Sequence, residues 1–176
     1  MIFLEILKYT LPSVVVFLTA YYLMKQQNER EQALLENEDK KEARKKNAEV
    51  LLPIRLQAYE RLVLFLERIH PHQLIVRHSN PALSSFQFQT ILIKSIREEY
   101  EHNLSQQLYV SSKAWNKVQQ AKEECLKQIN FAASKLDSQA KASDLGALVI
   151  QNFADLSPNP IREAIKQLKI DVQKGL

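Results

Sequence analysis

The sequence contains only two glycines, Gly146 and Gly175, far below average usage. Glycine supplies the backbone freedom that phosphate-binding loops, tight hairpins and strained turns require. Its scarcity therefore favours helices and disfavours a nucleotide-cradling loop. The Gly-x-Ser-x-Gly and His-Glu-x-x-His patterns of hydrolases and metalloproteases are also missing from the sequence. We expect a protein that is not an enzyme and needs no cofactor.

Cysteine is nearly absent as well, since Cys125 is the only one. A single cysteine excludes an internal disulfide. It leaves the redox compartment of the protein open and modestly favours a reducing one. Cys125 lies in the middle of an apolar helical stripe, where a thiol behaves as a small hydrophobic group with a raised pKa. The sequence therefore predicts an inert thiol instead of a nucleophile.

Neither sign of charge dominates the chain. Lysine and arginine total 24 against 20 acidic residues, a net charge of +4 that is spread along the sequence. Such a balance permits nucleic-acid binding but does not indicate it. A chain of 176 residues is long enough for one folded domain with an anchor and a linker.

An uncharged run extends from Tyr9 to Met24, preceded by apolar residues that only Glu5 and Lys8 interrupt. Such a run approaches the ~20 residues that cross a bilayer, so residues 1–24 are predicted to form an uncleaved transmembrane helix in contact with lipid. Basic residues are frequent after the run and rare before it. The positive-inside rule then places the N-terminus outside and the remainder in the cytoplasm.

The rest of the sequence predicts helices. Residues 25–50 are charged, contain no glycine or proline, and predict a helical stalk. Residues 51–176 predict an antiparallel bundle of about five helices. Pro53 is expected to start the first, with Ile54 on its core side. Residues 70–85 are expected to form a connection with one short turn around Leu74 to Val76. Later helices are predicted from Ser84 or Ser85 to Leu108, from Ser111 or Ser112 to Leu136, from Ser143 to Leu156, and over residues 161–172.

Three segments carry a family resemblance: residues 5–24, the run from Leu52 to Ile69, and the run from Glu101 to Ser111. Together they make the chain similar to an uncharacterised family of bacterial single-span membrane proteins. The resemblance implies an anchor in a bacterial inner membrane followed by a cytoplasmic helical bundle. It supplies no activity and no functional residue.

Two pairs match the Glu-x-x-His unit of ferritin-like di-metal bundles: Glu67 with His70, and Glu99 with His102. At 100° per residue, Glu67 falls on the polar side of its helix and His102 points away from the apolar stripe. His70, His72 and His78 have no thiolate near them and no recognised ligand spacing. We therefore expect no metal site, and a metal-dependent enzyme is the least favoured alternative.

Two surfaces are predicted to bind a partner. Asn103 and Gln107 are four residues apart and are expected to point into the apolar face of their helix, where amides must be hydrogen-bonded. Arg162, Lys166 and Lys169 form a basic stripe on the last helix. The leading hypothesis is a non-enzymatic, membrane-anchored interaction or scaffold protein with a protein partner. The alternative is a membrane-tethered contact with RNA or the ribosome through basic surfaces.

Overall fold

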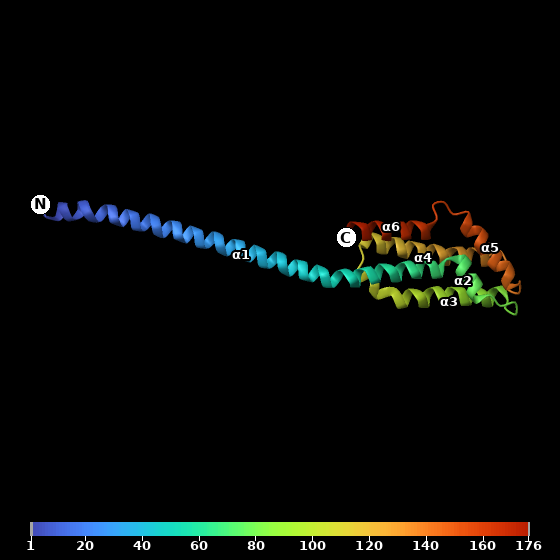
Figure 1. Ribbon diagram of the computed structural model, residues 1–176. Coiled ribbons are helices and arrows are strands. Elements are labelled where there is room, and N and C mark those ends of the chain that lie inside the picture. Colours follow the sequence, from blue (N-terminus) through green and yellow to red (C-terminus); the bar gives the residue numbers. More distant parts are fainter. Residues whose placement is uncertain (1, 176) are drawn as a thin grey trace. The chain divides into compact units, whose positions relative to one another are not determined.

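The computed structural model is all-α (Figure 1) and describes residues 2–175, with side chains for residues 15–32, 38, 40–42 and 45–174. The predicted all-α class is confirmed. Six α-helices and one 3₁₀ helix occur within that range: α1 (Ile2–Ile69), α2 (Pro71–His78), α3 (Ser85–Asn103), η1 (Leu104–Leu108), α4 (Ser112–Ala133), α5 (Ala142–Ala154) and α6 (Pro160–Gly175).

The chain divides into two units, Met1–Leu51 and Leu52–Leu176. The described part of the first unit is helical throughout and belongs to α1. The second unit contains the end of α1 and every other helix. The division falls next to the predicted start of the bundle at residue 51, and the charged stalk over residues 25–50 stays a prediction.

The predicted transmembrane helix over residues 1–24 is wrong by the criteria of length and hydropathy. Within the described residues, no helix has an apolar stretch long enough to cross a membrane. The uncharged run from Tyr9 to Met24 is shorter than the ~20 residues that a hydrocarbon layer requires. The side chains of Glu5, Lys8 and Tyr9, which entered that prediction, lie outside the described ones.

A helix was predicted to begin at Pro53, but α1 continues through this residue. A proline inside a helix removes one backbone hydrogen bond and crowds the preceding turn. Packing further along offsets that cost, because Leu62, Phe65 and Leu66 are fully buried. Ile54, which was expected on the core side, is 39% exposed.

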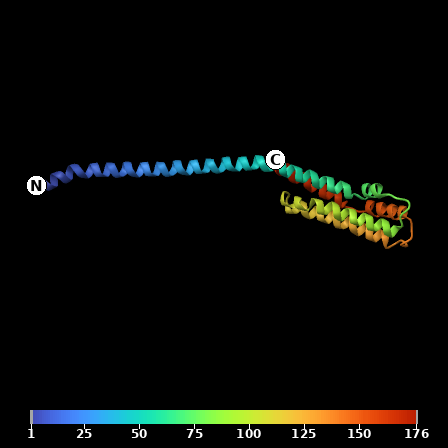
Figure 2. The ribbon, with the colours of Figure 1, turned by 90° about the horizontal axis from the view of Figure 1, so that it is seen from below.

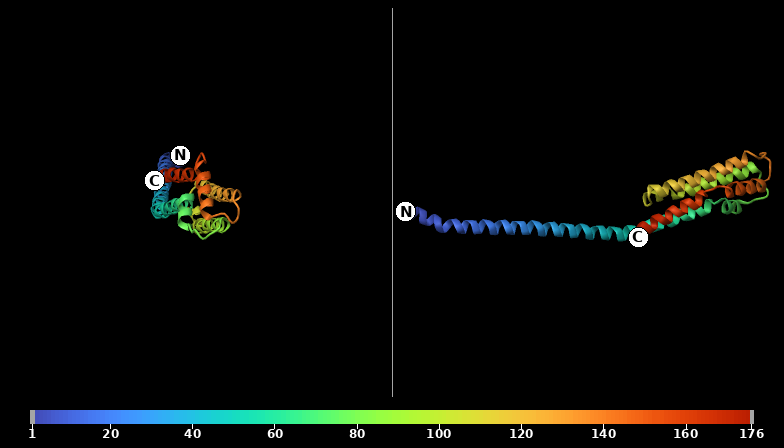
Figure 3. Two further views of the ribbon diagram at one scale, coloured as in Figure 1. Left: turned by 90° about the vertical axis from the view of Figure 1, so that its right-hand side faces the viewer. Right: turned by 90° about the horizontal axis from the view of Figure 1, so that it is seen from above.

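The core of the second unit is built from the apolar stripes of its helices. Helix α4 contacts α3, α5 and α6, and Figures 2 and 3 show α6 beside the last turns of α1. The predicted stripes of α3, α4, α5 and α6 are confirmed over most of their length. Their fully or nearly fully buried members include Leu92, Ile96, Trp115, Val118, Cys125, Ile129, Leu145, Val149, Phe153, Ile161 and Leu168.

Helix α2 spans Pro71–His78 and is longer than predicted, because residues 70–85 were expected to be a connection with only one short turn around Leu74 to Val76. Pro71 occupies the first turn of this helix, where its fixed φ suits the helix and its missing N–H is not needed. Leu74 is buried and Ile75 packs against the same core. Tertiary packing therefore stabilises a helix that is too short to be stable alone.

Serine caps start two helices as predicted. The Ser84 side chain accepts from the backbone N–H of Gln87, and the Gln87 side chain accepts from the Ser84 N–H, which completes a capping box. Ser111 caps α4 by accepting from the N–H of Ala114. The predicted start of α5 at Ser143 is wrong, since α5 begins at Ala142 with Lys141 at the N-cap.

Helix α3 ends at Asn103, and not at Leu108 as the apolar spacing predicted. The 3₁₀ helix η1 follows, with Leu104 42% exposed and Leu108 77% exposed. A 3₁₀ helix has three residues per turn, so successive side chains rotate by about 120° instead of 100°. This change of period moves the residues after Asn103 off the face that the α-helical spacing assigned to them.

Candidate interaction surface

Helix α6 presents a basic row to solvent. Arg162, Lys166 and Lys169 are all exposed, while Ile161 and Leu168 on the opposite side are buried. The spacing of four and three residues keeps the cations on one face of the helix. The row therefore contributes nothing to the core, and its predicted role in binding stays a prediction.

An apolar groove lies beside this row, between the last turns of α1 and helix α6. Its volume is about 360 Å³, and it is lined by Leu56, Tyr59, Glu60, Val63, Leu168, Lys169, Val172 and Gln173. The lining residues recur every three or four positions on each helix, which is the face that a helix offers to a neighbour. Lys169 belongs to both the basic row and the groove wall. The two features therefore form one continuous surface.

Tyr59 is the unusual member of the groove wall. Its side chain is 5% exposed, and within the described part of the chain its hydroxyl is buried without a hydrogen-bond partner. A buried hydroxyl without a partner costs about 1–3 kcal/mol, so native proteins seldom keep one. The Tyr59 hydroxyl is thus a buried polar group whose hydrogen-bonding capacity no described residue satisfies.

The predicted pair of Asn103 and Gln107 does not form. Asn103 is buried, and its Nδ2 donates to the Glu99 carbonyl at 2.8 Å. Gln107 is exposed, because the 3₁₀ turns of η1 rotate it away, and Gln106 is buried in its place. Asn103 therefore closes the C-terminal turn of its own helix, and the two amides do not form a joint surface.

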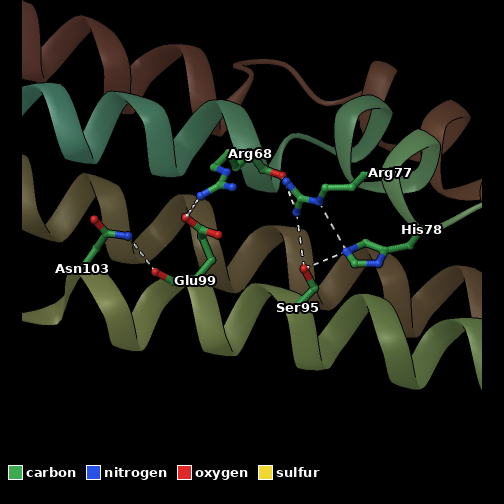
Figure 4. Close-up of polar contacts among 6 residues, drawn as sticks. All are labelled: Arg68, Arg77, His78, Ser95, Glu99 and Asn103. Carbon is green, nitrogen blue, oxygen red and sulfur yellow. Dashed lines mark hydrogen bonds and ion pairs between the residues drawn. The ribbon is translucent and has the colours of Figure 1, made fainter.

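A polar cluster joins α1, α2 and α3 (Figure 4). Arg68 forms an ion pair with Glu99, with 2.9 Å between Nη1 and Oε1. Arg77 donates from Nη2 to the Arg68 carbonyl and to Ser95 Oγ, each at 3.3 Å. A cation at the carbonyl end of α1 satisfies an acceptor that the helix leaves free. The cluster thus fixes the sharp turn between α1 and α2.

The same cluster contains a serine and a histidine in contact. His78 Nε2 lies 2.9 Å from Ser95 Oγ, and Arg77 Nε donates to the same nitrogen at 3.4 Å. Because a guanidinium only donates, Nε2 acts as an acceptor and the ring is neutral. Burial, and then the charge of Arg77, lower the pKa of His78. A serine activated for catalysis needs a base that gains a proton readily, and this guanidinium opposes that gain.

The lowered pKa of His78 predicts a dependence of stability on pH. The unfolded chain binds a proton near pH 6.5, whereas the folded chain binds it only at lower pH. The contribution is therefore present above pH 6.5 and is lost as pH falls through the folded pKa. Replacing His78 with glutamine should reduce the loss of stability between pH 7 and pH 5.5, measured by urea unfolding. His102→Gln, at an exposed position, is the control, and equal slopes in both variants would contradict the assignment.

The two Glu-x-x-His pairs are not brought together as a metal site. Glu67 and His102 are exposed, and Glu99 is paired with Arg68. His70 packs edge-on against Phe153, with ring centroids 5.5 Å apart. Within the described residues, no group of three or more histidine, cysteine or acidic side chains is placed to hold a metal ion.

A second hollow of about 320 Å³ lies between the loop after α2 and the start of α5. Gly146 allows the close approach there, since a Cβ at this position would lie 3.1 Å from Ile75 Cγ2. Its charged lining residue, Lys141, is exposed. The groove between α1 and α6 is the stronger candidate site, because its wall contains the buried, unpaired hydroxyl of Tyr59.

The helices described above make this an all-α protein, and its second unit contains all of the helices that follow α1. The chain belongs to the family of unknown function DUF7935, whose match covers residues 1–175. The predicted resemblance to an uncharacterised family is thereby confirmed, but the match shows neither a bacterial origin nor a membrane span. No curated protein matches the chain, and no solved structure does.

Sequence reasoning missed the groove and Tyr59. The spacing of Leu56, Tyr59 and Val63 on α1 does signal an apolar face. Nothing in the spacing shows that a neighbouring helix covers this face only in part. That information lies in how α1 and α6 pack.

Proposed function

We propose that this protein is a non-enzymatic helical interaction protein that binds a protein partner through the outer face of α6. The single observation that carries the proposal is the basic row of Arg162, Lys166 and Lys169 on α6. This row runs beside the apolar groove between α1 and α6. Aligned charges at the edge of an apolar surface provide both orientation and affinity in protein interfaces.

The polar cluster around Ser95 supports a binding role over a catalytic one. Its members are used in joining α1, α2 and α3. The buried Cys125 is likewise withdrawn from chemistry. The exposed row on α6 is not used in the packing of the second unit.

Reversing the charge of the row tests the proposal. The triple variant Arg162→Glu, Lys166→Glu and Lys169→Glu should keep its helical circular dichroism and its stability to within about 1 kcal/mol, because exposed charges contribute little to folding. Recovery of the protein partner by affinity purification of the full chain should fall by tenfold or more, since repulsive charges at an interface cost several kcal/mol.

A matched control reverses three cations elsewhere. Arg97, Lys113 and Lys127 are exposed on α3 and α4, so the same change of net charge is made on helices that do not carry the row. This control should retain the partner. Equal recovery with both triple variants would refute the role of the row. Loss of bound RNA instead of protein would support the alternative of an RNA contact and would also refute the proposal.

A further inference from the structure

The groove between α1 and α6 is an interhelical face without a third helix. Leu56, Tyr59, Glu60 and Val63 form one wall, and Leu168, Lys169, Val172 and Gln173 form the other. Two adjacent helices with apolar faces commonly bury them under another helix. The groove is thus shaped for a helix laid along both walls, which is a recurrent mode of peptide recognition.

The charges beside the groove specify one edge of that helix. Lys169 lies in the α6 wall, and Lys166 and Arg162 continue the same edge over the two preceding turns. Glu60 lies in the opposite wall and disfavours acidic side chains there. A helix with acidic residues along one edge only, spaced three or four positions apart, complements this arrangement.

The hydroxyl of Tyr59 supplies an independent observation. It is a buried donor without an acceptor in the described part of the chain, on a side chain that is 5% exposed. Glu60 lies in the same wall and disfavours a carboxylate there, so the fitting acceptor is an uncharged oxygen of the docked helix, such as that of a side-chain amide. The hydroxyl is enclosed in the free protein, so the acceptor reaches it only when side chains at the groove rim move on docking.

From the groove, the row and the unpaired hydroxyl, we infer that the occupant is an amphipathic helix of another protein, with apolar residues on one face and carboxylates along one edge. The apolar face fills the groove, and the carboxylates meet Lys169, Lys166 and Arg162. An uncharged polar side chain of the same helix accepts a hydrogen bond from Tyr59. The inference rests on the proposed function, because it names the kind of partner that the α6 surface binds.

Photo-crosslinking of the full chain in the cells that produce it tests this assignment. The photoreactive residue p-benzoylphenylalanine replaces Leu56 in the groove, Arg162 at the far end of the row, or Phe86 as a control. Phe86 is 62% exposed on α3 and lies outside the groove. The Leu56 probe should form an adduct with another protein, and mass spectrometry should place the attachment in an amphipathic segment with carboxylates on one edge.

The outcomes separate this inference from the proposed function. An adduct at Arg162 without one at Leu56 would leave the proposed function standing and overturn the helix in the groove. Adducts at neither position above the Phe86 level would overturn both. An adduct at Leu56 with RNA, a basic segment or a second copy of this chain would overturn the inference.

The Tyr59→Phe variant tests the role of the hydroxyl. A synthetic peptide of the crosslinked segment should bind the full-chain variant about three- to tenfold more weakly, as expected for one lost hydrogen bond to an uncharged acceptor. The melting temperature of the free variant should stay the same or rise, because an unpaired buried group is removed. A lower melting temperature, or unchanged peptide affinity, would show that the hydroxyl is not reserved for the partner.

Discussion

Replacement of Trp115 with alanine is expected to lower the free energy of unfolding by about 3–5 kcal/mol, the usual cost of truncating a buried aromatic ring. Trp115 is 7% exposed and stacks on Tyr100, with 5.7 Å between ring centroids. Tyr100 in turn contacts Phe65 at 6.0 Å. The indole thus connects α4 to α3 and, through α3, to α1.

Urea unfolding followed by far-ultraviolet circular dichroism measures this effect, because the chain has one tryptophan and its fluorescence is lost in the variant. Phe86→Ala is the control, since this ring is 62% exposed and should cost less than about 1 kcal/mol. A cost below about 1 kcal/mol for Trp115→Ala would mean that the ring belongs to a surface and not to the core.

Alkylation of Cys125 is expected to be about 1000-fold slower in the folded protein than in the unfolded chain at pH 8. Only the thiolate reacts, and burial, then the neighbouring Glu124, raise the pKa of Cys125 from 9.0 to about 12. Because the pKa of the thiol is about three pH units higher in the folded chain than in the unfolded one, the thiolate fraction at pH 8 is about 1000-fold lower. Restricted access to a side chain that is 1% exposed slows the reaction further.

Iodoacetamide labelling with and without urea, read by intact mass, measures the ratio of rates. A matched control carries Cys125→Ser together with Val76→Cys, which puts the single thiol at a 62% exposed position and should react rapidly without urea. Rapid labelling of native Cys125 would contradict its burial.

The raised pKa of Cys125 also makes the stability of the fold depend on pH. Because the unfolded thiol ionises above pH 9 and the folded one does not until about pH 12, the folded state loses stability as pH rises through this range.

The candidate interaction surface could be predicted only in part. The exposed row on α6 follows directly from the spacing of Arg162, Lys166 and Lys169, because an α-helix places these positions on one face. Gln107 could not be placed in the same way, because the chain changes from α-helix to 3₁₀ helix after Asn103. That change alters the rotation about the helix axis between successive side chains, and no local pattern in the sequence predicts it.

The sequence by itself determined the helical class, the serine caps at Ser84 or Ser85 and at Ser111 or Ser112, and the apolar surroundings of Cys125. These features depend on side-chain periodicity and on hydrogen bonds within one turn, both of which are local properties. Only the tertiary structure decided that α1 continues through Pro53, that α2 is a helix, and that Tyr59 is left without a partner. Each of these depends on contacts between segments far apart in the chain, and local preferences are too weak to fix them.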